Sequence, residues 1–294
     1  MATKRASVLG IIGGSGLYEI ADLTDISWRA VESAFGAPSD KFLFGEIAGK
    51  RVVFCPRHGR GHRIPPGEVN YRANIDALKR AGVTEIISIS AVGSLHEDFA
   101  PGTFVIVDQF IDRTVSRPVS FFGTGMVAHV SMAHPVCDRL GAVVEAEAKD
   151  LGIPTLRGGT YLAIEGPQFS SLAESELYRS WGAHVIGMTN MPEARLAREA
   201  EICYATVAMV TDYDCWHEGH EDVTVDAVIA TLMANADAAR ELISGLAPAF
   251  AGAPDPCPKG CHRALDHALI TAPDARDPVL CERLDAVAGR VLEG

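Results

Sequence analysis

The feature that most constrains the fold is a regular alternation of short apolar runs with longer amphipathic segments. The short runs are typical of buried strands and cover residues 7–13, 41–47, 51–56, 85–91, 103–111, 160–166, 184–188 and 204–212. The longer segments have helical spacing and cover residues 68–82, 136–152, 171–182 and 223–246. Strands that alternate with helices predict an α/β fold with parallel strands. Because the strands are apolar throughout, we expect helices on both faces of the sheet.

The organisation of the chain predicts one domain with a tail. At 294 residues, the chain is long enough for one large α/β domain, and no repeat or low-complexity segment divides it. Residues 252–278 are rich in Pro, Ala and Asp, which indicates a surface extension, and a last helix is expected near 279–292. We therefore expect a single domain over residues 1–294, with a C-terminal extension from about 252 to 294.

The overall charge argues against one class of partner. The formal net charge is −12, whereas a nucleic-acid-binding surface needs a basic stripe, so we expect no nucleic-acid partner. No run approaches the ~18 apolar residues of a membrane span. The first apolar run, residues 8–12, is also shorter than the core of a signal peptide. We therefore expect a cytoplasmic protein without a membrane partner.

A glycine-rich turn follows the first predicted strand. Its sequence, GSGLYE at residues 14–19, lacks the third glycine of a dinucleotide-binding loop, and no lysine follows as in an NTP-binding loop. Two interpretations remain. The backbone N–H groups and the Ser15 hydroxyl bind a free anion, or the turn has a purely structural role.

A basic loop follows the strand predicted at residues 51–56. Five basic side chains lie within seven residues of an otherwise acidic protein: Arg57, His58, Arg60, His62 and Arg63. Arginine binds phosphate through two parallel hydrogen bonds, and histidine adds another. The loop is therefore either a phosphate site or a solvated basic surface.

Two further segments could contact a small ligand. The strand at residues 85–91 runs into a Ser-Ala-x-Gly turn, which is a second candidate for anion binding or simply the end of a core strand. The loop at residues 165–169 contains Phe169, an aromatic residue that either stacks on a base or belongs to the core.

Two carboxyl groups lie just beyond the last predicted strand. Asp212 and Asp214 are two residues apart, and in an extended segment such residues face the same side. The pair binds N–H groups or donates a proton, or else it forms a turn and caps the following helix. Donation near pH 7 needs a pKa about 3 units above ~3.9, which burial and a like-charged neighbour can provide.

The chain contains seven cysteines. Cys55, Cys137, Cys203, Cys215 and Cys281 are scattered and are interpreted as reduced core thiols. Cys257 and Cys261 lie close to His262 and His267, a spacing that leaves a metal site, a disulfide and free thiols all open.

Several stretches occur in an order that resembles a known family. They are GIIGGSGL, RHGRGH, VNYRANIDALK, AVGSL, DQFIDRT, IEGPQFSS and TDYDCW. Over residues 8–246 the chain resembles the trimeric purine nucleoside phosphorylase family, and within it the branch that acts on 5′-methylthioadenosine. The resemblance implies an α/β fold with a twisted mixed sheet, partly closed into a barrel and flanked by helices. It also implies a homotrimer with active sites near the subunit contacts.

The resemblance implies a pentosyltransferase of purine and methionine salvage. Inorganic phosphate would attack the anomeric carbon of 5′-methylthioadenosine, releasing adenine and 5-methylthioribose 1-phosphate. The negative phosphate would stabilise the positive charge that develops on the sugar. A carboxyl group would neutralise the negative charge on the leaving purine by donating a proton or a hydrogen bond. Phosphate is then a co-substrate, and neither a metal nor another cofactor is expected.

The resemblance also assigns roles to individual residues. Phosphate contacts are implied for Ser15, Arg57, His58, Ser90, the backbone N–H of Ala91, and Thr189. Met188 would contact the ribose and Phe169 the purine, with Asp212 at N7 and Asp214 at the 6-amino group. The methylthio pocket would contain Val225, Val228 and His129, the last from a neighbouring subunit.

Other functions remain as alternatives. A phosphorylase of 6-oxopurine nucleosides or methylthioinosine is the first, although its relatives place Asn where Asp212 stands here. A hydrolytic nucleosidase would have little use for a phosphate site, and an NAD-dependent oxidoreductase would need the missing glycine. A non-catalytic nucleoside-binding protein would need base and sugar contacts without the phosphate set.

Overall fold

A single mixed sheet forms the middle layer of the computed structural model, which describes residues 7–14, 16–217, 225–250 and 257–292, with only the backbone at 225–228 and 230. Its main path runs β2-β3-β4-β1-β5-β10-β9-β7, while β11 pairs with β5 and carries β6 and then β8. The strands are β1 (Leu9–Gly13), β2 (Thr24–Arg29), β3 (Phe42–Ile47), β4 (Lys50–Pro56), β5 (Glu85–Ser94), β6 (Phe104–Ile106), β7 (Gln109–Arg113), β8 (Thr155–Arg157), β9 (Thr160–Ile164), β10 (Val185–Gly187) and β11 (Cys203–Asp212).

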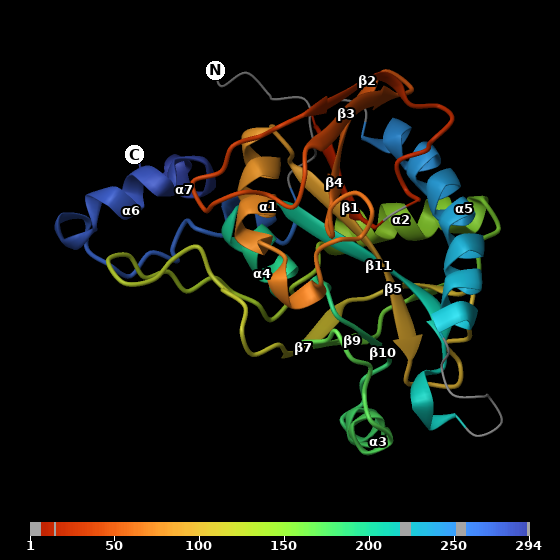
Figure 1. Cartoon of the computed structure of the whole chain (residues 1–294). Coiled ribbons are helices and arrows are strands. Elements are labelled where there is room, and N and C mark those ends of the chain that lie inside the picture. Colours follow the sequence, from red (N-terminus) through yellow and green to blue (C-terminus); the bar gives the residue numbers. More distant parts are fainter. Residues whose placement is uncertain (1–6, 15, 218–224, 251–256, 293–294) are drawn as a thin grey trace.

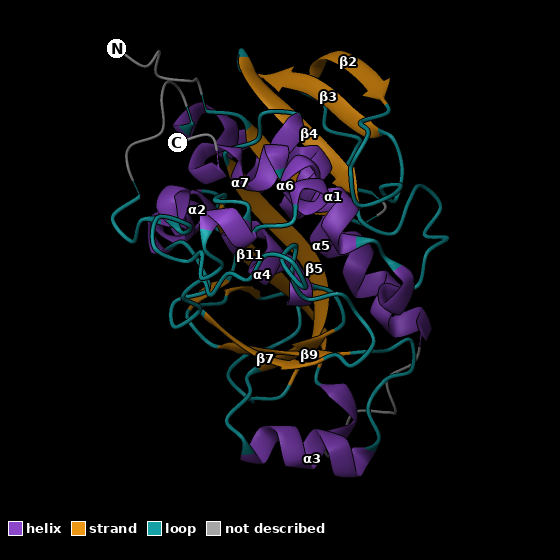
Figure 2. Ribbon diagram, turned by 90° about the vertical axis from the view of Figure 1, so that its left-hand side faces the viewer, coloured by secondary structure: helices purple, strands orange, loops and turns teal. Residues whose placement is uncertain are grey.

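Helices cover both faces of this sheet, as the apolar strands predicted (Figures 1 and 2). The helices are α1 (Tyr71–Arg80), α2 (Asp138–Asp150), α3 (Leu172–Ser180), α4 (Asn190–Glu199), α5 (Val225–Ala249), α6 (Pro278–Arg283) and α7 (Asp285–Leu292). Helices α1, α4 and α7 pack on one face, and α2 and α5 on the other. Adjacent side chains of β1 point to opposite faces of the sheet: Ile11 packs with α2 and α5, and Ile12 packs with α1 and α4.

The sheet divides along β5. Its first residues, Glu85–Ser88, pair with β1, whereas Gly93 and Ser94 pair with β10, and β11 runs along the opposite edge. Among the described residues, the outer strands of the two branches, β7 and β8, do not pair with each other. The expected α/β fold with a partly closed mixed sheet is therefore confirmed.

One predicted strand is wrong in a way that the sheet explains. The run at 103–111 forms two strands, β6 and β7, because the chain breaks at Val107 and Asp108 and crosses from one branch to the other. The neighbouring strands β8 and β9 break at the same level, at Gly158 and Gly159, whose φ values of 90° and 120° favour glycine. Two strands, β2 and β8, were not predicted, because none of their residues is buried.

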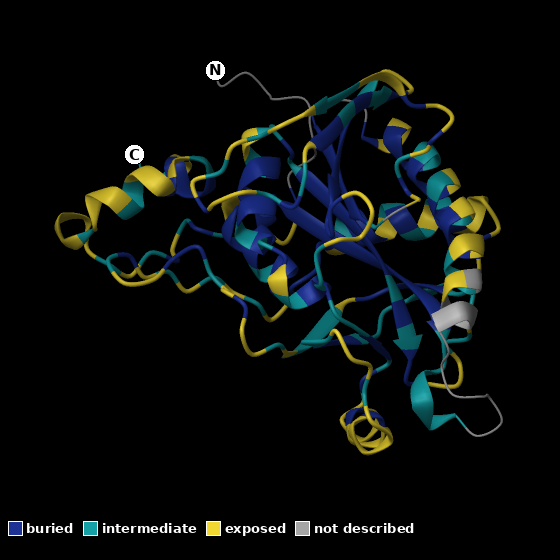
Figure 3. Cartoon of the chain, in the orientation of Figure 1, coloured by how far each residue is buried: buried dark blue, intermediate teal, exposed yellow. Residues whose placement is uncertain are grey.

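The C-terminal residues lie partly against the body of the protein and partly outside it. The helix expected at 279–292 is two helices, α6 and α7, which meet at Leu284. Val287 and Ala288 of α7 are buried in the core beside α1, whereas α6 is mostly exposed (Figure 3). The domain limits stay a prediction. Within the described ranges, no helix combines the length and the apolar character needed to cross a membrane.

Candidate active site

The candidate site lies where β1 parts from β5. The last pair between these strands is Ile12 with Ser88, and β10 joins β5 only at Gly93. Between these points β5 borders a cavity of about 370 Å³. Ligands of α/β proteins bind beyond the carboxyl ends of strands at such divergences. The division of the sheet therefore creates the site.

Most of the residues predicted for the site line this cavity. They are Arg57, His58, Ser90, Ala91, Phe169, Met188, Thr189, Asp212 and Asp214. Ser15 lies outside the described residues, as do the side chains of Val225 and Val228, although Gly14 beside Ser15 lines the cavity. His129 is exposed and does not line it; its backbone N–H binds the C-terminal extension. The individual roles stay predictions.

Arg57 is the buried cation of the site. Its Nε donates to Glu193 Oε2 at 2.9 Å and its Nη2 to Glu193 Oε1 at 3.2 Å. Nη2 also donates to Ser88 Oγ, and Nη1 donates to the Ile89 carbonyl at 3.2 Å. These bonds use four of the five guanidinium hydrogens. The guanidinium is thus fixed in orientation, and among the described residues one Nη1 hydrogen has no acceptor.

Two hydroxyl groups lie at the same end of the cavity. Ser90 Oγ donates to Asn190 Oδ1 at 3.0 Å, which places it on β5 facing the start of α4. Thr189, the residue before α4, has a buried Oγ1 without a hydrogen-bond partner of normal geometry among the described residues. A buried hydroxyl that lacks a partner is costly unless a ligand satisfies it. Since Ser90 already donates to Asn190, the Thr189 hydroxyl and the remaining Arg57 hydrogen are the donors that this end can offer to an anion.

His58 is neutral in this environment. Its Nδ1 lies 2.8 Å from the Ile64 carbonyl, which can only accept, so Nδ1 carries the hydrogen and Nε2 has the lone pair. Burial and then the charge of Arg57 lower the pKa of His58 to about 3, against the opposing effect of the Ile64 carbonyl. The ring is therefore uncharged above about pH 5.

We expect the His58 ring not to titrate between about pH 5 and 8 in phosphate-free protein, because its pKa lies below that window. Adding phosphate should raise this pKa, since a nearby negative charge favours the imidazolium. Histidine-selective NMR measures both, with the His58→Asn spectrum assigning the resonance. A midpoint near ~6.5 without phosphate would contradict the described burial.

The basic loop does not act as one unit. Only Arg57, His58 and His62 reach the cavity, and the rings of the two histidines stack with centroids 4.3 Å apart. Arg60 and Arg63 instead extend into solvent and pair with Asp40, at 2.9 and 3.5 Å. The interpretation as a solvated basic surface holds for Arg60 and Arg63, whereas phosphate binding by the residues that reach the cavity stays a prediction.

The carboxyl groups lie at the other end of the cavity. A bulge in β11 places Val210 opposite Val92 but Asp212 opposite Gly93, which turns Asp212 toward the cavity. Asp214 follows in a 3₁₀ turn with φ of 55°. Its N–H donates to Asp212 Oδ1 at 2.8 Å. The two carboxyl groups thus converge through a turn, which the sequence had left open beside an extended segment.

Burial raises the pKa of both carboxyl groups. For Asp212, burial outweighs the hydrogen bonds from the Thr211 hydroxyl, at 2.7 Å, and from the Asp214 N–H. For Asp214, burial acts first and the charge of Asp212 adds to it, against the Ser175 hydroxyl at 2.6 Å. The direction agrees with the sequence argument. The like-charged neighbour, however, contributes at Asp214 and not at Asp212.

Gly93 provides the space that these carboxyl groups occupy. A Cβ placed on it would lie 3.0 Å from Asp212 Oδ1 and 3.1 Å from Ile186 Cγ2. We expect Gly93→Ala to raise KM for the nucleoside about fivefold or more, given an overpacking cost of ~1–3 kcal/mol. Steady-state kinetics at fixed phosphate measures it. Gly123→Ala is the matched control, because its Cβ meets nothing within 4 Å; equal KM values for both variants would contradict the expectation.

The remaining contacts form the wall between the two ends. Met188 follows β10, and a Cβ on Gly166 would lie 2.5 Å from its sulfur, so this loop needs glycine there. Phe169 lines the cavity and is nevertheless 57% exposed, which is unusual for a core residue and suits a side chain that covers a ligand. Leu232 and Ala236 of α5 supply apolar lining.

Sequence reasoning missed the residues that hold the site in place. Glu193 pairs with Arg57, Ser175 of α3 donates to Asp214, and buried Arg117 binds the Met188 carbonyl at 2.7 Å and Glu165 at 2.8 Å. The only available signal was that a buried Arg57 would need a buried acid. Nothing in the spacing indicates which acid, since Glu193 lies 136 residues away.

The fold and the cavity place the chain in the phosphorylase superfamily, to which it belongs: the family's model matches residues 8–248. Within the superfamily the resemblance noted in the sequence is confirmed. The chain is 63% identical to the protein named S-methyl-5′-thioadenosine phosphorylase of Rhodospirillum rubrum, with 98% of each chain covered. It is 62% identical to the protein of the same name from Cereibacter sphaeroides, over 98% of this chain and 99% of that protein.

Solved structures agree with these relatives. A methylthioadenosine phosphorylase from an antarctic soil metagenomic library matches with a TM-score of 0.88 and 46% identity, covering 97% of this chain and 99% of the other. The methylthioadenosine phosphorylase of Schistosoma mansoni in complex with adenine matches with a TM-score of 0.78 and 38% identity, covering 83% and 91%.

Proposed function

We propose that this protein catalyses the phosphorolysis of 5′-methylthioadenosine, giving adenine and 5-methylthioribose 1-phosphate. The observation that carries the proposal is one cavity with anion donors at one end and two buried carboxyl groups at the other. High identity to proteins named for this reaction supports the choice of substrate.

Phosphate occupies the end formed by Arg57, Ser90 and Thr189 in this proposal. An Nη1 hydrogen of the Arg57 guanidinium and the buried Thr189 hydroxyl donate to its oxygens. His58 accepts a proton from phosphate at Nε2 or, once charged, donates to it. The bound anion lies against the sugar, where its charge stabilises the positive anomeric carbon and one of its oxygens forms the new bond.

The purine occupies the carboxyl end. Asp212, whose raised pKa increases its protonated fraction, donates a hydrogen bond or a proton at N7 as the glycosidic bond breaks. Asp214 accepts from the 6-amino group, and Ser175 holds it in place. The proton that Asp212 gives to the leaving base is recovered from solvent after release.

The residues that line the cavity between its two ends determine which nucleoside is bound. Met188 contacts the ribose, Phe169 covers the base, and the apolar lining from α5 suits a methylthio group better than a hydroxyl. We include Ser15, the Ala91 N–H, Val225 and Val228 in this site on the family resemblance. The reaction as proposed needs no metal or redox cofactor.

A homotrimer is also proposed, with His129 of a neighbouring subunit completing the methylthio pocket. His129 is exposed in the single chain and does not line the chain's own cavity, which agrees with a role across a subunit contact. The cytoplasmic location stays a prediction.

The deciding experiment compares methylthioadenosine, adenosine and inosine, each with and without phosphate. We expect that methylthioadenosine releases adenine only when phosphate is present. Absorbance or chromatography measures this release. Turnover of inosine alone would favour the 6-oxopurine alternative. Release that is independent of phosphate would indicate a hydrolase, and tight nucleoside binding without turnover a binding protein.

A further inference from the structure

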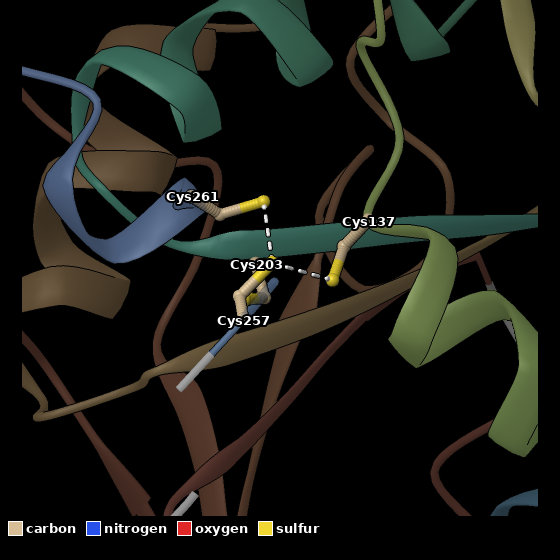
Figure 4. A group of neighbouring side chains, drawn as sticks. All are labelled: Cys137, Cys203, Cys257 and Cys261. Carbon is tan, nitrogen blue, oxygen red and sulfur yellow. Dashed lines mark hydrogen bonds between the residues drawn. The ribbon is translucent and has the colours of Figure 1, made fainter. Parts of the chain in front are cut away.

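Four cysteines from distant parts of the chain meet in one buried cluster (Figure 4). Cys137 precedes α2, Cys203 begins β11, and Cys257 and Cys261 belong to the C-terminal extension. All four are buried, and their Sγ atoms all lie within 4.8 Å of one another. Cys257 Sγ is 3.5 Å from that of Cys137 and 3.3 Å from that of Cys261. The cluster lies apart from the candidate active site, because none of its members lines that cavity.

These separations suit one tetrahedral ion. Zinc–sulfur bonds of about 2.3 Å in a tetrahedron place neighbouring sulfurs about 3.8 Å apart, close to the observed spacing. A cluster of several irons would hold its cysteine sulfurs farther apart than 4.8 Å. Four soft thiolates around one ion are the ligand set of structural zinc sites.

The surroundings favour thiolates. A zinc ion with four thiolates carries a net charge of −2. Buried Arg198 compensates part of it, since its Nη1 lies 3.3 Å from Cys261 Sγ. Arg139 lies beside Cys203, and the start of α2 places backbone N–H groups near Cys137.

We propose that Cys137, Cys203, Cys257 and Cys261 bind one structural zinc ion, which ties the C-terminal extension to β11 and to the start of α2. Loss of the thiol protons to solvent accompanies binding. For Cys257 and Cys261 the sequence left a metal site, a disulfide and free thiols open. The nearby His262 and His267 are exposed, and the side chains that meet the pair belong to two distant cysteines. Sequence spacing missed them because the C-terminal extension folds back over the sheet.

Metal analysis of the full chain, expressed without a metal-binding tag and dialysed, tests the proposal. We expect about one zinc ion per chain by inductively coupled plasma mass spectrometry. Titration with a mercurial should release this zinc in step with thiol modification, and a cobalt-loaded protein should show the intense visible bands of tetrahedral thiolate coordination. These readouts use the unmodified protein and do not depend on activity.

Substitution then locates the ion. Cys261→Ser should lower the zinc content at least tenfold and reduce the thermal midpoint, whereas Cys281→Ser should keep both, since Cys281 lies in α6 outside the cluster. Zinc-free protein, bound iron instead of zinc, or a mass reduced by two hydrogens for each disulfide would overturn the proposal. So would zinc content unchanged by Cys261→Ser. If that variant is insoluble, the mercurial titration decides alone.

Discussion

Replacing Asp212 with alanine should lower kcat for phosphorolysis by about two to four orders of magnitude, the usual contribution of a general acid. The leaving purine would lose its proton or hydrogen-bond donor, while the phosphate end of the cavity stays intact. Steady-state kinetics with methylthioadenosine at saturating phosphate measures the loss. Phosphate binding, measured separately by calorimetry, should change little, because Asp212 lies at the opposite end of the cavity.

The conservative variant separates the chemistry from the packing. Asp212→Asn keeps the size of the side chain but supplies an amide, which can donate to a 6-oxo group as well as accept from N7–H. We expect the ratio of kcat/KM values for inosine and methylthioadenosine to rise in this variant. Unchanged selectivity for adenine would contradict the role assigned to Asp212, and a kcat loss below about tenfold in Asp212→Ala would exclude it as the acid.

Glu193→Ala should lower the free energy of unfolding by about 3–5 kcal/mol, because it leaves the buried Arg57 charge without its partner. The side chains of both residues are only 2% exposed. Ser88 and Tyr204, which donate to Glu193 at 2.6 and 2.9 Å, would also lose their acceptor. Urea unfolding at fixed protein concentration measures the free energy of unfolding, and KM for phosphate should rise because Arg57 is no longer held in orientation.

An exposed pair provides the control for this variant. Glu145 pairs with Lys149 at 2.6 Å on the surface of α2, and Glu145→Ala should cost only about 0.5 kcal/mol. A loss for Glu193→Ala below about 1 kcal/mol would mean that Arg57 is not confined as described.

Local sequence patterns predicted the strands and helices that face a core. They failed where pairing with distant strands determines where a strand begins and ends. The run at 204–212 forms a strand, β11, because each of its residues suits a buried sheet. The run at 103–111 is similarly apolar, yet it divides because the sheet divides beside it. Periodicity describes one segment at a time, so it does not contain this information.

The same distinction applies to the site. Arg57, His58, Ser90 and Asp212, which all line the cavity, were singled out because each lies near or just beyond the end of a predicted apolar strand. That residue pattern does not reveal which side of the loop faces the cavity, and so Arg60 was grouped with Arg57 until the structure paired it with Asp40. The supporting residues are set by contacts between distant segments, which composition and spacing do not encode.

The long strand β5 also sets the distance between the two ends of the cavity. Ser90, at the phosphate end, and Gly93, against the carboxyl groups, are three residues apart on one strand. At about 3.3 Å per residue they are separated by roughly 10 Å, a distance that no loop movement can adjust. Gaining or losing one residue between them would change that length and turn the following side chains to the opposite face. The separation between these two parts of the cavity is therefore set by the number of residues in a strand.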